Sequence, residues 1–386
     1  KVKPIDNYGF YDEDITDILI DDWNKTMVGS NARGGMASLG IDLIILGTIE
    51  TLEGSTLASA SSRYNQDNGQ PLIGLVKINK EVDYSKEKSQ EYFQAIVFHE
   101  FTHILGFSIY NFRNIYHNVF SQVDEFGVMR TYINSAKVVE TARKYFNCPD
   151  LEGVELEEYG GEGTAGSHWE ARILLGDYMN GVSYLEEEVI SEFTLAYLED
   201  TGFYKPNYYT GGLMRHGKGK GCDFLQKKCV ISQEVNSLFK NEFFSSILSD
   251  TNYDASCSSG RLSRAYHYFT YYSEIPSAFQ YFDDSSKGGF TSADYCPVSR
   301  GILNESDISH YVGSCNTKGT GEYGMRILYH AQEVIKNKTH TTTRHFTYYN
   351  KSGDIVDITG ESLSEQSFCY QSTLLKDGLV FNNYIP

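Results

Sequence analysis

Two histidines bracket a glutamate in the run His-Glu-Phe-Thr-His at positions 99–103. Residues four apart share one face of a helix, so His99 and His103 can point at one metal ion if this segment is helical. The spacing is typical of zinc sites, where histidine nitrogens lie about 2.0–2.1 Å from the ion. Zinc lowers the pKa of bound water toward about 7, and Glu100 would take the proton before the water attacks a carbonyl. The run therefore predicts metal-assisted hydrolysis.

The segment around this run has the pattern of a helix that follows buried strands. Four residues fall at i, i+4, i+7 and i+11 and so share one helix face: Tyr92, Ile96, His99 and His103. Gly106 can end the helix in a left-handed conformation. The apolar runs 42–46 and 72–78 predict two buried strands before it.

A catalytic zinc ion usually takes three protein ligands and a water molecule, so a third ligand is required. Thermolysin-like enzymes take a glutamate further along the chain, for which Glu125 is a candidate. Metzincins turn sharply at a glycine and supply a third histidine. The short-gap metzincin pattern fails here because Ile109 stands at the position expected to be histidine. A third histidine must therefore follow an insertion.

Two later histidines are candidates for this ligand. His117 is typical of an ordinary loop histidine. His168 follows the glycine-rich stretch 160–167 and precedes a turn sequence in which Met179 could form an apolar floor beneath the site. The combination favours His168, while Glu125 remains the alternative.

Length, composition and charge limit the classes of partner. The chain has 386 residues, 40% of them hydrophobic, which favours a folded protein with a sizeable core. Its formal net charge of -18 repels phosphate backbones and anionic lipid, so we expect no nucleic-acid partner.

The longest apolar stretch, 41–49, is far shorter than the roughly 20 residues of a membrane-spanning helix. A targeting or anchoring segment is expected to have been removed or never included, because the chain begins at Lys1 without an apolar leader.

Seven cysteines and four glycosylation sequons favour a secreted or extracellular surface protein. Six of the cysteines follow position 220 at wide spacings, which predicts disulfides and leaves their pairing open. The sequons begin at Asn24, Asn304, Asn337 and Asn350.

A second long helix and a change of composition indicate further domains. A capping-box pattern at 183–186 precedes an apolar stripe formed by Leu185, Val189, Phe193 and Ala196, and the helix is expected to stop at Gly202. Beyond about position 205, glycines, cysteines and aromatic residues become frequent. We predict an N-terminal catalytic subdomain at 1–106, a central domain at 107–228 and a strand-rich C-terminal domain at 229–386.

These pieces together resemble the leishmanolysin family of zinc metzincins. The matching segments are 99–108, 166–170, Met179, 198–204, 221–225 and 294–298. The resemblance implies an α+β fold: a metzincin-type catalytic domain with a twisted mixed sheet and active-site helix, a central domain, and a disulfide-containing, strand-rich C-terminal domain. It also implies a secreted or surface zinc endopeptidase that acts on proteins or peptides, with one Zn²⁺ ion.

The family pattern assigns roles to particular residues of this sequence. His99, His103 and His168 would be the zinc ligands, and Glu100 the general base. Met179 would form the turn beneath the metal. The stretch Leu57, Ala58 and Ser59 looks like part of the strand that pairs with substrate backbone.

Two functions remain open at this point. The first is an active zinc endopeptidase. The alternative is a catalytically silent, leishmanolysin-like surface glycoprotein that acts in adhesion or assembly. The intact Glu100 favours the enzyme, because a protein without catalytic demand need not keep that carboxylate.

Overall fold

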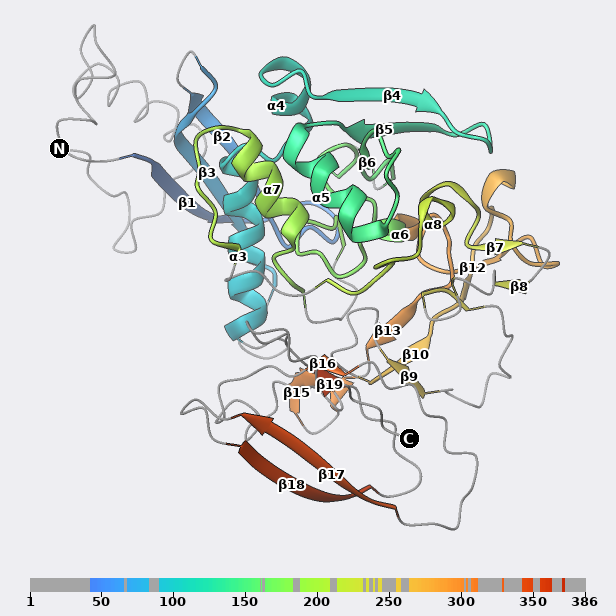
Figure 1. The fold of residues 1–386 in the computed structure, drawn as a ribbon. Coiled ribbons are helices and arrows are strands. Elements are labelled where there is room, and N and C mark those ends of the chain that lie inside the picture. Colours follow the sequence, from blue (N-terminus) through green and yellow to red (C-terminus); the bar gives the residue numbers. More distant parts are fainter. Residues whose placement is uncertain are drawn as a thin grey trace, which may run out of the picture.

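The computed structural model describes most of the chain from residue 42 to residue 301 and several strands beyond it. The described residues are 42–65, 68–82, 90–159, 161, 164–182, 188–208, 214–231, 234–235, 239, 242–244, 255–257, 264–301, 303–304, 307–311, 328–329, 342–349, 355–362 and 370–371. Figure 1 shows their course.

A three-stranded mixed sheet begins the described chain. It contains β1 (Ile44–Glu50), β2 (Ala58–Asn65) and β3 (Pro71–Asn79) in the order β1-β3-β2. Strand β1 runs parallel to β3, and β2 runs antiparallel to β3. The central strand β3 buries most of its apolar residues, as expected for a strand with a neighbour on each side. The two predicted strands are confirmed, although β1 begins two residues later than its apolar run.

Helix α3 (Gln90–Ile104) lies against this sheet and carries the His-Glu-Phe-Thr-His run, so the predicted helix is confirmed (Figure 1). The contact is close at Gly74 of β3, where an added Cβ atom would lie 2.4 Å from Ile104 Cγ2. A larger residue at that position would displace the side chain of Ile104. The sheet therefore fixes the C-terminal end of α3, which is where the two histidines lie.

The chain leaves α3 through Gly106, whose φ of +118° is a conformation that residues with a Cβ atom rarely adopt. It then enters the short helix α4 (Ile109–Asn114), where the Ser108 hydroxyl accepts a hydrogen bond from Asn111 N at 3.3 Å. The expected stop at Gly106 is confirmed, since α3 ends at Ile104.

A central region of helices and a second sheet follows. The antiparallel sheet contains β4 (Val119–Val123), β5 (Met129–Ile133) and β6 (Val154–Glu155). The helices are α5 (Ala136–Phe146), α6 (Ala171–Leu174), α7 (Glu192–Asp200) and α8 (Cys222–Gln226). The Asp200 carboxylate at the end of α7 accepts hydrogen bonds from Lys137 N and Val138 N at 2.8 and 3.0 Å. It thereby satisfies backbone donors at the start of α5, which Ser135 does not cap.

Helix α7 is shorter than its sequence pattern predicted. It begins at Glu192, where the Ser191 hydroxyl accepts hydrogen bonds from Phe193 N and Thr194 N. The predicted capping box at 183–186 lies outside the described residues. Val189, expected inside the helix, instead forms a β-bridge with Asp177. The bridge uses Val189 N and O for backbone hydrogen bonds to Gly176 and Tyr178, so this residue cannot join the helix.

Two disulfides link distant parts of the chain, which confirms the prediction of disulfides. They join Cys148 to Cys222 and Cys229 to Cys296. Of the remaining cysteines, Cys315 and Cys369 lie outside the described residues, as do three of the four sequons; Asn304 ends β14.

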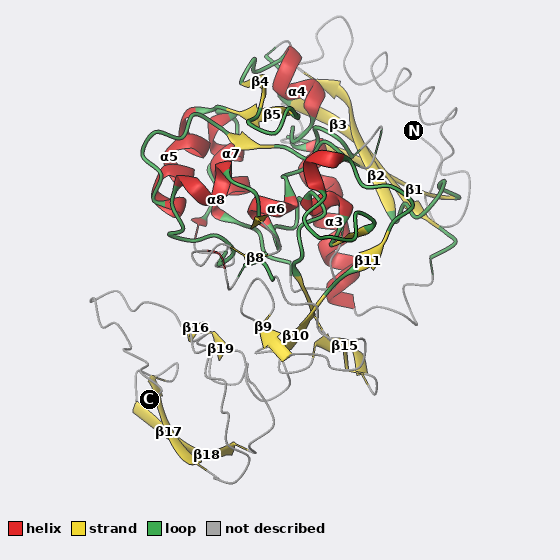
Figure 2. Cartoon of the chain, turned by 90° about the vertical axis from the view of Figure 1, so that its right-hand side faces the viewer, coloured by secondary structure: helices red, strands yellow, loops and turns green. Residues whose placement is uncertain are grey.

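The later part of the chain forms short sheets, as a strand-rich segment should. The strands are β7 (Val230–Ile231), β8 (Glu234–Val235), β9 (Ala255–Cys257), β10 (Arg264–His267), β11 (Thr270–Tyr271), β12 (Lys287–Gly288), β13 (Ser299–Gly301), β14 (Leu303–Asn304), β15 (Asp307–Tyr311), β16 (Leu328–Tyr329), β17 (Thr342–Tyr349), β18 (Ile355–Ser362) and β19 (Tyr370–Gln371). Figure 2 shows the helices gathered in one part of the molecule and β16 to β19 in another. The described helices include none that is both long and apolar enough to cross a membrane. The predicted domain boundaries at 106 and 228 stay predictions.

Candidate metal centre

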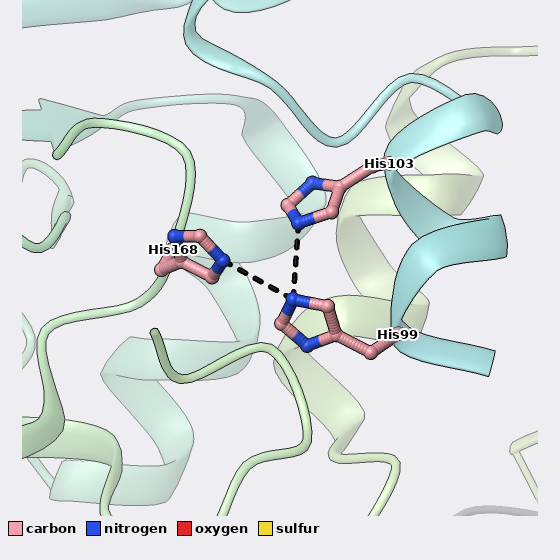
Figure 3. Close-up of side chains that lie close together, drawn as sticks. All are labelled: His99, His103 and His168. Atoms are coloured by element: carbon pink, nitrogen blue, oxygen red, sulfur yellow. Dashed lines mark hydrogen bonds between the residues drawn. The ribbon is translucent and has the colours of Figure 1, made fainter. Parts of the chain in front are cut away.

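Three imidazole rings from two distant segments meet beside helix α3 (Figure 3). His99 Nε2 lies 3.0 Å from His103 Nε2 and 3.1 Å from His168 Nε2. The first two rings project from successive turns of α3, and the third comes from the loop that follows the glycine-rich stretch. The structure therefore brings together the three histidines that the sequence singled out.

Backbone carbonyls fix the tautomer of each ring. His99 Nδ1 contacts the carbonyl oxygen of Tyr178, His103 Nδ1 that of Phe107 at 2.7 Å, and His168 Nδ1 that of Thr164 at 2.8 Å. A carbonyl oxygen only accepts, so each Nδ1 must carry the proton and donate it. In a neutral ring the Nε2 atom then has a lone pair and no proton. The Nε2 lone pairs of the three rings therefore point toward one another (Figure 3), as the ligand atoms of a metal site would.

Burial keeps these rings neutral. It lowers the pKa of His99, and it lowers the pKa of His168 to about 3. Burial lowers the pKa of His103 well below its ordinary value, and repulsion from the other two rings adds to this effect. The neutral imidazole is the form that binds a metal ion.

The nitrogen separations fit one tetrahedral zinc ion. With Zn–N bonds of about 2.0–2.1 Å, tetrahedral angles place neighbouring nitrogens roughly 3.3 Å apart. The observed 3.0 and 3.1 Å are close to that spacing. The donor set, three neutral histidines whose other ring nitrogens are hydrogen-bonded, is also the set that zinc favours in catalytic sites.

The segment that carries His168 is held from both sides. On one side, Glu157 N donates to the His168 carbonyl at 2.9 Å. On the other, Trp169 N donates to the carbonyl of Met179 at 3.0 Å. The third histidine thus lies on a short extended stretch between β6 and the turn that contains Met179.

An aromatic cluster anchors this stretch to the end of α3. The ring of Phe107 lies 5.1 Å from that of Phe112, 5.0 Å from Trp169 and 5.1 Å from Tyr197, measured between centroids. All four side chains are fully buried. Trp169 follows His168 and Phe107 closely follows His103, so packing of these two rings brings the third histidine to the helix.

The turn that contains Met179 is buried beside the site. Asn180 N donates to the Asp177 carbonyl at 3.0 Å, which closes the turn. The Asp177 carboxylate accepts hydrogen bonds from Met179 N at 2.6 Å and from the Thr194 hydroxyl. Met179 is fully buried in the main hydrophobic core. These contacts give the turn a single conformation next to the histidines.

Glu100 is a buried carboxylate on the same helix, with 5% of its surface exposed. Its Oε2 atom has no hydrogen-bond partner among the described residues. Burial raises the pKa of Glu100 to about 8. A carboxyl group in this environment is suited to accept and release a proton near neutral pH.

The alternative third ligands lie elsewhere. Glu125 is exposed in the turn between β4 and β5, and its carboxylate is not among the ligand atoms that gather at the two helix histidines. His117 is exposed between α4 and β4, with a left-handed φ of 51°. Leu57, Ala58 and Ser59 are half-buried at the start of β2, the strand at the edge of the sheet next to α3.

A buried cluster of charged side chains, which we call the ion cluster, was not predicted from the sequence. It consists of the carboxylates of Glu155, Glu170 and Asp294 with the guanidinium groups of Arg130 and Arg172. Arg130 Nη1 lies 2.8 Å from Glu155 Oε1, and Arg172 Nη2 lies 2.9 Å from Glu155 Oε2. Asp294 comes from far along the chain, so no local spacing could reveal the cluster.

A cavity of about 460 Å³ lies beside this cluster and away from the three histidines. Arg130, Arg172, Glu155 and Asp294 line part of it, but their charged atoms are already paired with one another. The cavity is therefore not the metal centre.

The sequence also missed the backbone partners of the histidines. The carbonyl groups of Phe107, Thr164 and Tyr178 orient the three rings, yet every residue has a carbonyl group. Which carbonyl group faces a histidine ring depends on how the backbone is oriented in the folded state. Residue type does not encode that orientation.

A helix with two histidines and a buried glutamate, completed by a third histidine from a loop, is the arrangement of a mononuclear metallohydrolase site. A family model described as leishmanolysin matches residues 30–323. The chain therefore belongs to the leishmanolysin family, a family of metallopeptidases.

Individual relatives agree with this assignment. The chain is 33% identical over 277 residues to a leishmanolysin homolog of Crithidia fasciculata, covering 68% of this chain and 40% of that protein. It is 35% identical over 216 residues to a leishmanolysin-like peptidase of Caenorhabditis elegans, covering 50% of this chain and 32% of the relative. It is 30% identical over 275 residues to leishmanolysin of Leishmania major, with coverages of 69% and 42%. The chain thus spans less than half the length of these relatives.

Proposed function

We propose that this chain is a zinc-dependent endopeptidase in which His99, His103 and His168 hold one Zn²⁺ ion. One observation carries the proposal: three neutral imidazoles converge with Nε2 separations of 3.0 and 3.1 Å, and their Nδ1 atoms all donate to backbone carbonyls. Family membership adds support, because the leishmanolysin family is a metallopeptidase family.

Glu100 is the general base of the proposed reaction. Its free Oε2 atom can accept a proton from the attacking water and pass it to the leaving amine. Burial excludes competing solvent from this carboxylate. A bound zinc ion supplies a water molecule of lowered pKa and polarises the scissile carbonyl group.

The edge of strand β2 is the proposed site for substrate backbone. In the described part of the sheet, β2 is an edge strand that pairs with β3 on one side. An extended peptide can add to such an edge, which would make Leu57, Ala58 and Ser59 part of the substrate-binding strand. Proteins or peptides are accordingly the proposed substrates.

The remaining family features complete the proposal. Met179 belongs to the turn beneath the metal in a metzincin-type catalytic domain, and the layout is an N-terminal subdomain, a central domain and a C-terminal domain with boundaries at 106 and 228. A secreted or cell-surface location is supported by the two disulfides, which form and persist in oxidising compartments.

The test compares the parent chain with Glu100→Gln on a denatured protein substrate, with bound zinc measured in both. We expect Glu100→Gln to keep one zinc ion per chain and to lower turnover by a factor of roughly 10²–10⁴. Glu125→Gln is the matched control: it changes an exposed carboxylate and should leave activity and zinc unchanged. It also tests the thermolysin-like alternative directly.

Two results would contradict the proposal. Equal turnover by the parent and Glu100→Gln would remove Glu100 as the base. Complete inactivity of a zinc-bound parent, with any blocking segment excluded, would support the silent adhesion or assembly role instead.

A further inference from the structure

Tyr178 contacts helix α3 at two points, through its backbone and through its side chain. Its carbonyl oxygen accepts the hydrogen bond from His99 Nδ1. Its hydroxyl oxygen lies 2.6 Å from the hydroxyl oxygen of Thr102. Because His99 and Thr102 are three residues apart on α3, one residue of the Met179 turn holds two positions of the active-site helix.

The direction of the hydroxyl contact follows from a count of protons. The Thr102 hydroxyl donates its only proton to the Phe98 carbonyl at 2.8 Å. It can therefore only accept from Tyr178, so the Tyr178 hydroxyl is the donor. The resulting chain runs from Tyr178 through Thr102 to Phe98, the residue directly before His99.

Both hydroxyl groups are shielded from water. Tyr178 is 5% exposed and Thr102 is 4% exposed. A buried hydroxyl that loses its partner cannot recover the hydrogen bond from solvent, so the geometry of this pair is enforced. The peptide group between Tyr178 and Met179 is also held through its N–H, because Met179 N donates to the Asp177 carboxylate. The hydroxyl pair is thus a second side-chain bond between this turn and the helix, beside that of His99.

We propose that the Tyr178–Thr102 hydroxyl pair positions His99 for the metal. Tyr178 and Thr102 are positioning residues: the pair holds the Tyr178 carbonyl in line with His99 Nδ1 and so aims Nε2 of His99 at the other two rings. His99 is the ring whose Nε2 lies close to both others, so an error in its orientation affects both nitrogen separations. The inference rests on the metal centre of the proposed function, but not on peptidase activity.

The experiment measures how fast zinc leaves the fully loaded protein when a chromogenic chelator is added in excess. We expect zinc release from Tyr178→Phe and from Thr102→Val to be about 10- to 100-fold faster than from the parent, the usual effect of removing a group that orients a ligand. Thr102→Ser keeps the hydroxyl and should restore slow release. The double variant should release zinc no faster than the worse single variant, because both changes remove the same bond.

The matched control is Tyr145→Phe. Tyr145 is 3% exposed, and its hydroxyl donates to the His216 carbonyl at 2.8 Å, within the core rather than at the metal centre. Zinc release from this variant should match the parent. The visible spectrum of the Co²⁺-substituted protein provides a second readout, which should change in Tyr178→Phe and not in Tyr145→Phe.

Zinc release from Tyr178→Phe at the parent's rate would overturn the inference. So would equally fast release from Tyr145→Phe, because the effect would then reflect the loss of any buried hydroxyl. A parent that holds zinc and cleaves nothing would refute the proposed enzyme while leaving this measurement valid. A parent that binds no zinc would overturn both proposals.

Discussion

The metal centre and the ion cluster contain the same number of potential metal ligands, although only the ion cluster is buried at all three residues. In each, one ligand atom from each of three side chains lies within 4.8 Å of the others. The metal centre has His99, His103 and His168, and the ion cluster has Glu155, Glu170 and Asp294. By ligand count alone the two regions are equivalent.

They differ in whether the fold supplies a cation. In the ion cluster, Arg172 lies 2.9 Å from Glu155 and 3.1 Å from Asp294, and Arg130 lies 2.8 Å from each. In the metal centre, the three rings make their polar contacts within the described part of the chain with one another and with backbone carbonyls. Among the described residues, the histidine lone pairs thus have no cationic partner, whereas the carboxylates of the ion cluster have two guanidinium groups.

Protons complete the charge balance of the ion cluster. Burial raises the pKa of Glu155, although the two arginines oppose that shift. Burial and the neighbouring carboxylates raise the pKa of Glu170 well above its ordinary value. Two guanidinium groups and retained protons can thus balance three buried carboxyl groups without a metal ion.

The largest expected effect is the loss of the third ligand. We expect His168→Ala to abolish stable zinc binding and to lower turnover on the order of 10³-fold or more, because metal polarisation of a carbonyl is worth several kcal/mol. Metal analysis after dialysis and a protein-cleavage assay check this. Glu125→Ala should bind zinc and turn over like the parent; loss of zinc from that variant with retention in His168→Ala would reverse the ligand assignment.

Removal of an internal cation should affect stability rather than metal content. Arg172→Met leaves Glu155 and Asp294 with one guanidinium partner fewer, and we expect it to lower the free energy of unfolding by about 3–5 kcal/mol. Urea denaturation measures this loss, and the folded variant should still bind one zinc ion.

The control for this variant is Lys144→Met, which breaks an exposed pair with Glu140 and should leave the urea midpoint nearly unchanged. A similar midpoint for Arg172→Met and the parent would show that the ion cluster contributes no net stability. Loss of zinc from folded Arg172→Met would instead show that the two regions are not independent.

The smallest expected effect is the response of stability to added metal. Zinc at about one hundred times its dissociation constant should stabilise the metal-free chain by roughly 2.7 kcal/mol. Calcium, which prefers carboxylate oxygens, should produce no shift in the thermal midpoint because the arginines already occupy the ion cluster. A calcium-dependent shift that disappears in Glu170→Gln would show that the cluster is a metal site after all.

The sequence predicted the parts of the site that depend on local geometry. The helix around His99 and His103 follows from their spacing and from the apolar residues on the same face, and α3 contains both. The strands before it were predicted from apolar runs, with an error of a few residues at their ends. The pattern failed at Val189, where a β-bridge to Asp177 took the backbone groups that a helix would have used.

The amino-acid sequence by itself determined the residue types of the candidate site: two histidines and a glutamate at helical spacing, with a third histidine available. Only the tertiary structure decided which histidine completes the set, since His168 lies 69 residues from His99 and is brought there by buried aromatic packing. It also decided which buried carboxylates have cationic partners within the protein, because Arg130 meets Asp294 across 164 residues. The physical reason is that hydrogen bonding within a helix is local, whereas neutralising a buried charge depends on whatever side chains the fold brings within a few ångströms.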